Sequence, residues 1–239
     1  MPNIYVFITI IMASLVKGIT GFGFALLSLP ILLRWYAPKE IIPILMICNL
    51  VASLFIIFQK KEHKLIDESS RLLIASGGLF TIIGVLVLKH IKTDWLLHLS
   101  ALVFIILTIL SLIKKKKPKA SISKPIYPIA GALIGLITGS ISISGPPLAL
   151  FLNRAQVEND KFREIFAWFS IVTASIAIVT YIRLGLLSMQ VIKQALIFSP
   201  ILLFGSVIGK RLNRNIPHSR FKMVNIILTL LSSLMLLND

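Results

Sequence analysis

The stretch "KGITGFGFALLSLP" at residues 17–30 interrupts an apolar segment that is otherwise long enough to cross a membrane. It holds three glycines, Gly18, Gly21 and Gly23, and it begins with a lysine, Lys17. Lipid offers no partner to bare backbone N–H and C=O groups, so irregular backbone at membrane depth has to be buried in protein or line a cavity. We therefore expect a broken membrane segment whose break faces the interior of the protein.

The composition of the 239-residue chain is that of a membrane protein. Its mean hydropathy is +0.92, 56% of its residues are hydrophobic and 14% are charged, whereas soluble domains carry about 25% charged residues. The net charge of +16 comes from basic runs between apolar segments, such as "KKKKPK" at 114–119. Such runs are typical of loops that lie beside anionic lipid headgroups. We therefore expect a lipid bilayer, and no nucleic acid, as a partner of the chain.

Eight apolar segments follow one another, and most are about 17–20 residues long, the length that a helix needs to span ~30 Å of hydrocarbon. None alternates as a membrane β-strand does, so we interpret all of them as helices. The first and the fifth are longer than the rest, and both are interrupted. The segments lie near residues 4–33, 41–58, 72–88, 95–113, 126–152, 164–182, 191–209 and 221–237.

The chain contains an internal repeat. The interrupted stretch at 18–34 is similar to "GLITGSISISGPPLALFLNR" at 135–154, and three further apolar segments follow each copy. Repeats with broken segments are a recurring design of transporters. We interpret the chain as two membrane repeats, residues 1–113 and 124–239, joined by a basic linker at 114–123.

The distribution of Lys and Arg distinguishes two topologies. If all eight segments cross the membrane, each side receives 12 Lys and Arg residues, which gives no bias. If the two interrupted segments are re-entrant, one side has 18 and the other has 6, with Lys17 in neither count. The positive-inside rule favours the second arrangement. It predicts an all-α polytopic membrane protein of two inverted repeats, in which each repeat is a broken, re-entrant segment followed by three transmembrane helices. The protein is expected to lie in the cell (inner) membrane, with both termini on its outer side.

The two breaks form the predicted substrate site, and its chemistry suits a small anion. A helix that restarts after a break points free N–H groups and the positive end of its dipole into the cavity. The alternative is that the small residues only allow tight helix packing. The candidate substrate-binding residues are Lys17, Gly18, Thr20, Gly21, Phe22, Gly23, Thr138, Gly139, Ser140, Ser142, Ser144, Gly145 and Pro146.

Lys17 is an ionisable residue inside an apolar segment, and all nine acidic residues lie in loops or at segment ends. It is therefore a candidate counter-charge for an anionic substrate, the alternative being that it snorkels to an interface. The lack of a carboxylate within a segment favours movement down an anion gradient over proton coupling. Weaker candidates for lining the pathway, with interhelical hydrogen bonds as the alternative, are Asn49, Ser53, Thr173 and Ser175.

Several functions are not expected from this sequence. No metal-ligand set, nucleotide-binding loop or catalytic triad is recognisable, so we expect neither an enzyme nor a cofactor or metal. Cys48 is the one cysteine, which excludes an intrachain disulfide. No positively charged region precedes the first apolar run, so a cleaved signal peptide is not expected.

The two motifs "GITGFGFALLSLPIL" at 18–32 and "GLITGSISISGPPLAL" at 135–150 resemble those of the sulfite exporter family TauE/SafE. The resemblance covers nearly the whole chain, although the second motif has Ser140 to Ile143 where the family usually has more glycine. It implies a permease that moves small sulfur-containing anions, such as sulfite or organosulfonates, across the cytoplasmic membrane of prokaryotes. The competing classes are a membrane assembly or scaffold factor that transports nothing, and a channel, for which a filter repeat is lacking. The sequence leaves the oligomeric state open, with a homo-oligomer among the options.

Overall fold

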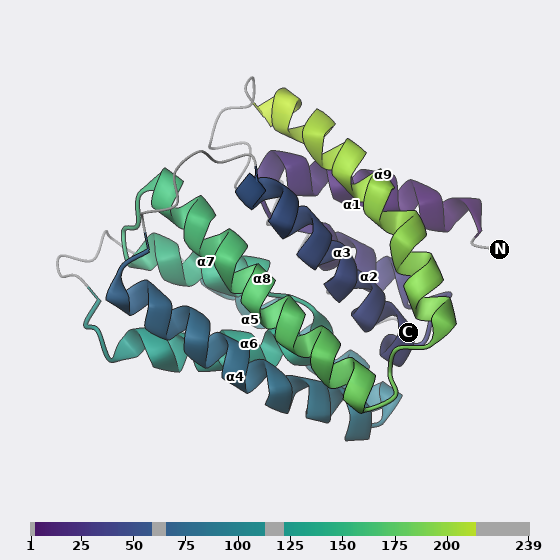
Figure 1. Ribbon diagram of the computed structural model, residues 1–239, viewed down its shortest axis with the longest axis horizontal. Helices are drawn as coiled ribbons and strands as arrows, with labels where there is room; N and C mark the ends of the chain where they lie inside the picture. The colour runs from purple at the N-terminus through teal and green to yellow at the C-terminus, as the bar shows by residue number, and fades with distance from the viewer. Residues whose placement is uncertain (1–2, 59–65, 113–121, 214–239) are drawn as a thin grey trace.

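The computed structural model describes residues 3–58, 66–112 and 122–213, and Figure 1 shows how their helices lie. These residues form nine helices and no strand, which confirms the predicted all-α class. In chain order the helices are α1 (Ile4–Thr20), α2 (Phe24–Leu32), α3 (Pro38–Phe58), α4 (Glu68–His90), α5 (Thr93–Leu112), α6 (Ile126–Ile141), α7 (Gly145–Arg154), α8 (Asn159–Arg183) and α9 (Met189–Asn213). The predicted segment at 221–237 and most of the linker at 114–123 lie outside the described residues, so the division into two repeats stays a prediction.

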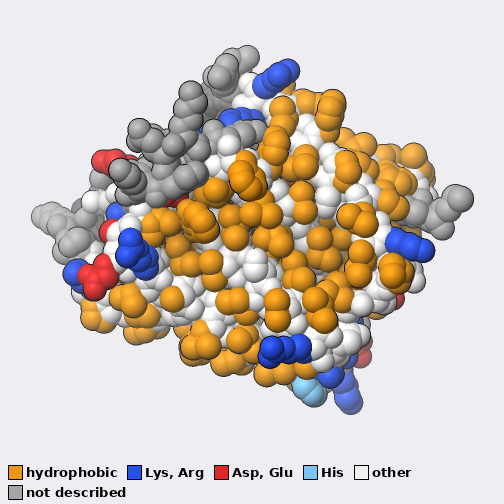
Figure 2. Space-filling view, viewed as in Figure 1, with side chains coloured by type: hydrophobic (Ala, Val, Ile, Leu, Met, Phe, Trp, Pro, Cys, Tyr) orange, Lys and Arg blue, Asp and Glu red, His pale blue; other side chains and the backbone are white. Residues whose placement is uncertain are grey.

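The outer surface of the molecule is apolar. Helices α3, α4, α8 and α9 are long and apolar enough to cross a membrane. Large hydrophobic side chains lie on the outside: Phe204 is 75% exposed, and Leu79 and Leu133 are each 62% exposed. Figure 2 shows apolar side chains across the visible face, with Lys and Arg side chains at its margins. An exposed apolar surface of this extent is typical of a protein that lies in lipid.

Both breaks expected from the sequence are present, and they end in the same way. Helix α1 stops before Gly21, which has a φ of 81°, and α6 stops before Ser142, which has a φ of 59°. The N–H groups of these left-handed residues donate to the carbonyls of Lys17 and Thr138, respectively. Glycine adopts this conformation freely, whereas serine does so at a cost of roughly 1–2 kcal/mol. Lys17 and Thr138 therefore occupy the same position relative to their breaks.

The short helix after each break turns back toward the start of the broken segment. The ring of Trp35, just beyond α2, stacks on Tyr5 in the first turn of α1, with ring centroids 6.3 Å apart. In the second broken segment, Phe151 of α7 packs edge-on against Tyr127 at the start of α6, at 5.1 Å. Neither broken segment therefore runs straight through the molecule.

The helices pack as two bundles that do not coincide with the two halves of the sequence (Figure 1). The first bundle contains α1, α2, α3 and α9, and the second contains α4, α5, α6, α7 and α8. Within them, α1 packs on α9 and α6 packs on α4, each at glycines that let the backbones approach closely. A Cβ on Gly18 would lie 2.8 Å from the Cα of Gly209, and one on Gly139 would lie 3.0 Å from the Cα of Gly84. The two bundles meet where α3 packs on α8.

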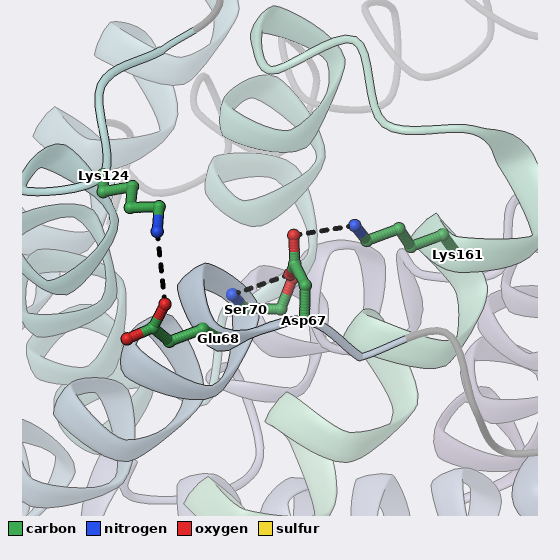
Figure 3. A network of polar contacts seen from close by, with 5 residues as sticks. All are labelled: Asp67, Glu68, Ser70, Lys124 and Lys161. Carbon is green, nitrogen blue, oxygen red and sulfur yellow. Dashed lines mark hydrogen bonds and ion pairs between the residues drawn. The ribbon is translucent and has the colours of Figure 1, made fainter.

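Ion pairs hold the first turns of α4 and α8, and the entry to α6, together at one end of the molecule (Figure 3). Lys161 lies 2.9 Å from Asp67, and Lys124 lies 3.2 Å from Glu68. Asp67 also caps α4, because its carboxylate accepts the backbone N–H of Ser70 at 3.0 Å. Burial raises the pKa of Asp67, but hydrogen bonds from Ser70 and Lys161 outweigh it and lower that pKa from 3.8 to about 2.

Candidate functional site

A pocket lies where the two breaks meet between the two bundles. It has about 290 Å³ of free space, part of which is open to solvent. The enclosed part of the pocket is smaller than this figure, so the pocket suits only a small ligand. Residues predicted from the sequence that line it are Lys17, Phe22, Gly23, Asn49, Ser142, Ser144, Gly145 and Pro146.

Lys17 brings a buried charge to the pocket. Its side chain is 5% exposed, and its ammonium donates a hydrogen bond of 2.8 Å to the amide oxygen of Asn49 on α3. Among the described residues no carboxylate forms an ion pair with Lys17. The amide oxygen is a neutral acceptor, so it orients the ammonium without cancelling its charge. An uncompensated buried charge costs several kcal/mol, which a bound anion would offset.

Helix α2 begins at the wall of the pocket and contributes backbone donors. Its N-cap is Gly23, with a φ of 105° and no side-chain cap. Within the part of the chain that the structure describes, the N–H groups of Phe24 and Ala25 have no acceptor. Free N–H groups at a helix start, together with the positive end of the helix dipole, favour an anion.

The second break supplies hydroxyl groups rather than charge. Ser144 and Ser170 line the pocket and are 9% and 5% exposed, and neither hydroxyl has a hydrogen-bond partner among the described residues. The hydroxyl of Ser142 lies 3.9 Å from the sulfur of Met46, which is a weak acceptor. The start of α7 offers few backbone donors, because Pro146 and Pro147 have no N–H.

Apolar side chains enclose these polar groups and bring the breaks into contact. Phe22 of the first break packs on Phe166 of α8, with ring centroids 6.0 Å apart. A Cβ on Gly145 would lie 2.7 Å from the Cβ of Phe22, so glycine is needed at this contact. Apolar walls lower the local dielectric and so strengthen electrostatic interactions inside the pocket.

Other predicted site residues contribute to helix packing or form hydrogen bonds within their own helix. Gly18 and Gly139 contact α9 and α4, as the packing alternative expects. The hydroxyls of Thr138 and Ser140 donate to carbonyls of their own helix, those of Ile134 and Leu136, at 2.7 and 3.0 Å. Gly21 forms the left-handed turn, and the side chain of Thr20 lies outside the described structure. A substrate contact by any of these residues stays a prediction.

The weaker candidates for lining the pathway differ in whether they line the pocket. Asn49 lines the pocket, whereas Ser53, Thr173 and Ser175 do not line it. Ser53 is buried and its hydroxyl has no partner within the described residues, and the hydroxyl of Thr173 donates to the carbonyl of Phe169 at 2.7 Å. Ser175 is half-buried.

Sequence reasoning missed several residues of the pocket. Ser170 is the twelfth residue of α8, as Asn49 is the twelfth residue of α3. The predicted segments at 41–58 and 164–182 did not show this match, because they begin at other positions. The apolar members carry no sequence signal. The missed residues are Phe24, Ala25, Leu26, Ile143, Phe166 and Ser170.

Glu164 lies near the start of α8, which agrees with the expected position at a segment end, but its side chain is fully buried. The described helices therefore contain a buried carboxylate, and movement without proton coupling stays a prediction.

The family model described as "Sulfite exporter TauE/SafE" matches residues 6–236 of the chain. No curated protein and no solved structure matches the chain significantly.

Proposed function

The chain belongs to the sulfite exporter TauE/SafE family, a family of membrane transporters and not of enzymes, and from this premise we propose that it moves a small anion through the pocket between its two breaks. Sulfite or an organosulfonate is the proposed substrate, and the cytoplasmic membrane is the proposed location. The observation that carries the proposal is the buried ammonium of Lys17, held by a neutral amide beside the start of α2.

In the proposed site the charge of the anion is met from the first bundle. The ammonium of Lys17 and the N–H groups of Phe24 and Ala25 are donors on residues that line the pocket. Hydrogen bonds to charged groups contribute about 1.5–3 kcal/mol each. Among the described residues no carboxylate pairs with Lys17, so an entering anion does not have to displace a carboxylate from the ammonium.

We further propose the predicted topology, two inverted repeats with re-entrant broken segments. Support comes from the two matching breaks, from the return of α2 and α7 toward the starts of α1 and α6, and from the reciprocal pairing of α1 with α9 and α6 with α4. The end that carries the ion pairs of Lys124 and Lys161 faces the cytoplasm, and both termini lie outside. The test is labelling of single cysteines placed at Lys117 and Lys161. We expect both cysteines to be labelled from the cytoplasmic side, and labelling of the two from opposite sides would refute the topology.

The packing bears on which parts of the molecule are proposed to move. Rocking of one sequence half against the other would separate α1 from α9 and α6 from α4, whose backbones touch at glycines. Alternating access by rocking of the first bundle against the second leaves those contacts intact. The pocket lies between the bundles, as a site exposed in turn to each side requires.

Flux through proteoliposomes tests the proposed function. The purified protein transports radiolabelled sulfite or methanesulfonate, and Lys17→Gln reduces the rate about ten-fold or more, since a charged hydrogen bond is lost. Lys193→Gln, at an exposed position of α9, is the matched control and leaves the rate unchanged. Absence of flux for both anions with a folded protein would favour the assembly-factor alternative. Unchanged flux in Lys17→Gln would refute the role of Lys17.

A further inference from the structure

A comparison of the two broken segments identifies a residue whose role sequence reasoning did not assign. Lys17 and Thr138 each precede a left-handed break by one turn, and Asn49 and Ser170 are each the twelfth residue of the helix that follows. Asn49 and Ser170 both line the pocket. The two positions thus lie in the same local setting, one in each half of the chain.

The polar groups at these positions pair with each other in the first half but not in the second. Lys17 donates to Asn49 at 2.8 Å, so this pair is complete. Thr138 instead donates to the carbonyl of Ile134 within its own helix, at 2.7 Å. The hydroxyl of Ser170 is left without a partner in the described structure, although the residue is 5% exposed. Its oxygen is not among the fully buried polar atoms without a partner, so the hydroxyl is accessible in the pocket, where it can bind a ligand.

We propose that Ser170 is a substrate-binding residue, which donates its hydroxyl to an oxygen atom of the transported anion. Ser144, the other unpartnered hydroxyl of the pocket, lies in the same bundle and donates alongside it. The inference rests on the proposed function and adds the contribution of the second bundle to the site.

This assignment narrows the class of substrate. The first bundle offers a charge and backbone N–H groups, and the second offers two neutral hydroxyl donors. An oxyanion carries several acceptor oxygens directed to different sides, so it can accept from both bundles at once. A monatomic anion has one acceptor centre and satisfies fewer of these donors. The site therefore selects oxyanions, and the bound oxyanion bridges the two bundles.

The test compares four variants in sulfite binding by calorimetry and in sulfite flux. Ser170→Ala weakens binding about ten-fold or more, as expected for a lost hydrogen bond to a charged group. The side chains of Thr and Val have nearly the same shape, but only Thr carries a hydroxyl group. Ser170→Thr therefore binds sulfite more tightly than Ser170→Val, by a similar factor. Ser100→Ala removes a buried hydroxyl on α5 that bonds to its own helix, and it leaves sulfite binding unchanged.

The outcomes separate the two proposals. If the wild-type protein neither binds nor transports sulfite or methanesulfonate, the proposed function fails and this inference fails with it. If the wild-type protein binds sulfite and Ser170→Ala binds it within two-fold as well, the inference is overturned and the proposed function stands. Where Ser170→Ala does not fold, equal binding by the threonine and valine variants overturns the inference in the same way.

Discussion

Gly139 separates two interpretations of the second break, because it was predicted as a substrate residue and lies at a helix contact. In Gly139→Ala the new Cβ would overlap the carbonyl oxygen of Thr81 and lie 3.0 Å from the Cα of Gly84. Ordinary contacts begin at 3.4 Å, so the contact with Gly84 alone requires α4 to move by about 0.4 Å, and the overlap with Thr81 requires a larger shift. Both obstructing atoms are backbone atoms that cannot rotate away. Overpacking of this kind costs about 1–3 kcal/mol. A loss of about 2 kcal/mol lowers the melting temperature of a chain of this size by roughly 4–8 °C.

The assay follows the monodisperse fraction of detergent-purified protein after heating, together with the KM for sulfite of the folded protein. Packing predicts a lower melting temperature for Gly139→Ala with an unchanged KM. Leu133→Ala, at an exposed position of the same helix, is the control and leaves both quantities near their wild-type values. A raised KM with an unchanged melting temperature would refute the packing assignment and restore Gly139 to the substrate site.

Three further predictions follow from the contacts. Because the pKa of Asp67 is lowered, its ion pair and helix cap contribute stability above pH 3.8 that is lost as the pH falls toward 2. Asp67→Asn therefore lowers the melting temperature at neutral pH and makes its decline in acid less steep. A pH dependence of the melting temperature that equals that of the wild type would contradict this. Asn49→Leu removes the acceptor of the Lys17 ammonium, so sulfite flux falls with a raised KM, and a wild-type KM would contradict the positioning role of Asn49. Spin labels at Met12 and Phe204, within the first bundle, keep their separation when sulfite is added, whereas labels at Met12 and Leu133, one in each bundle, change theirs; the opposite result would refute movement between the bundles.

Much of the fold could be predicted from the sequence because the bilayer limits the choices. Apolar runs of membrane-spanning length predicted the helices, and the glycines near residue 21 and the prolines near residue 146 predicted where two of them break. The partition into bundles could not be predicted in this way. It depends on the close approach of Gly18 to Gly209 and of Gly139 to Gly84, and sequence position does not indicate which distant glycine faces which.

The candidate site was predicted less completely, and the reason is helical register. An alignment of Thr20-Gly21 with Thr138-Gly139 matches letters, but the left-handed residues that end the helices are Gly21 and Ser142. The letter alignment is therefore three residues out of register. It concealed that Thr138 stands where Lys17 stands.

The difference between Lys17 and Thr138 has a physical rationale for a transporter. Two ammonium groups in one small pocket would repel each other in a low dielectric, and the empty protein would bear the desolvation cost of both. One ammonium keeps that cost at one charge, and an amide oxygen at 2.8 Å supplies its hydrogen bond without neutralising it. Hydroxyls on the opposing bundle can donate to an anion without adding charge. An anion that is bound by a charge from one bundle and by neutral donors from the other favours a state in which both bundles close on it. When the anion has left, the empty protein has to accommodate only a single buried charge.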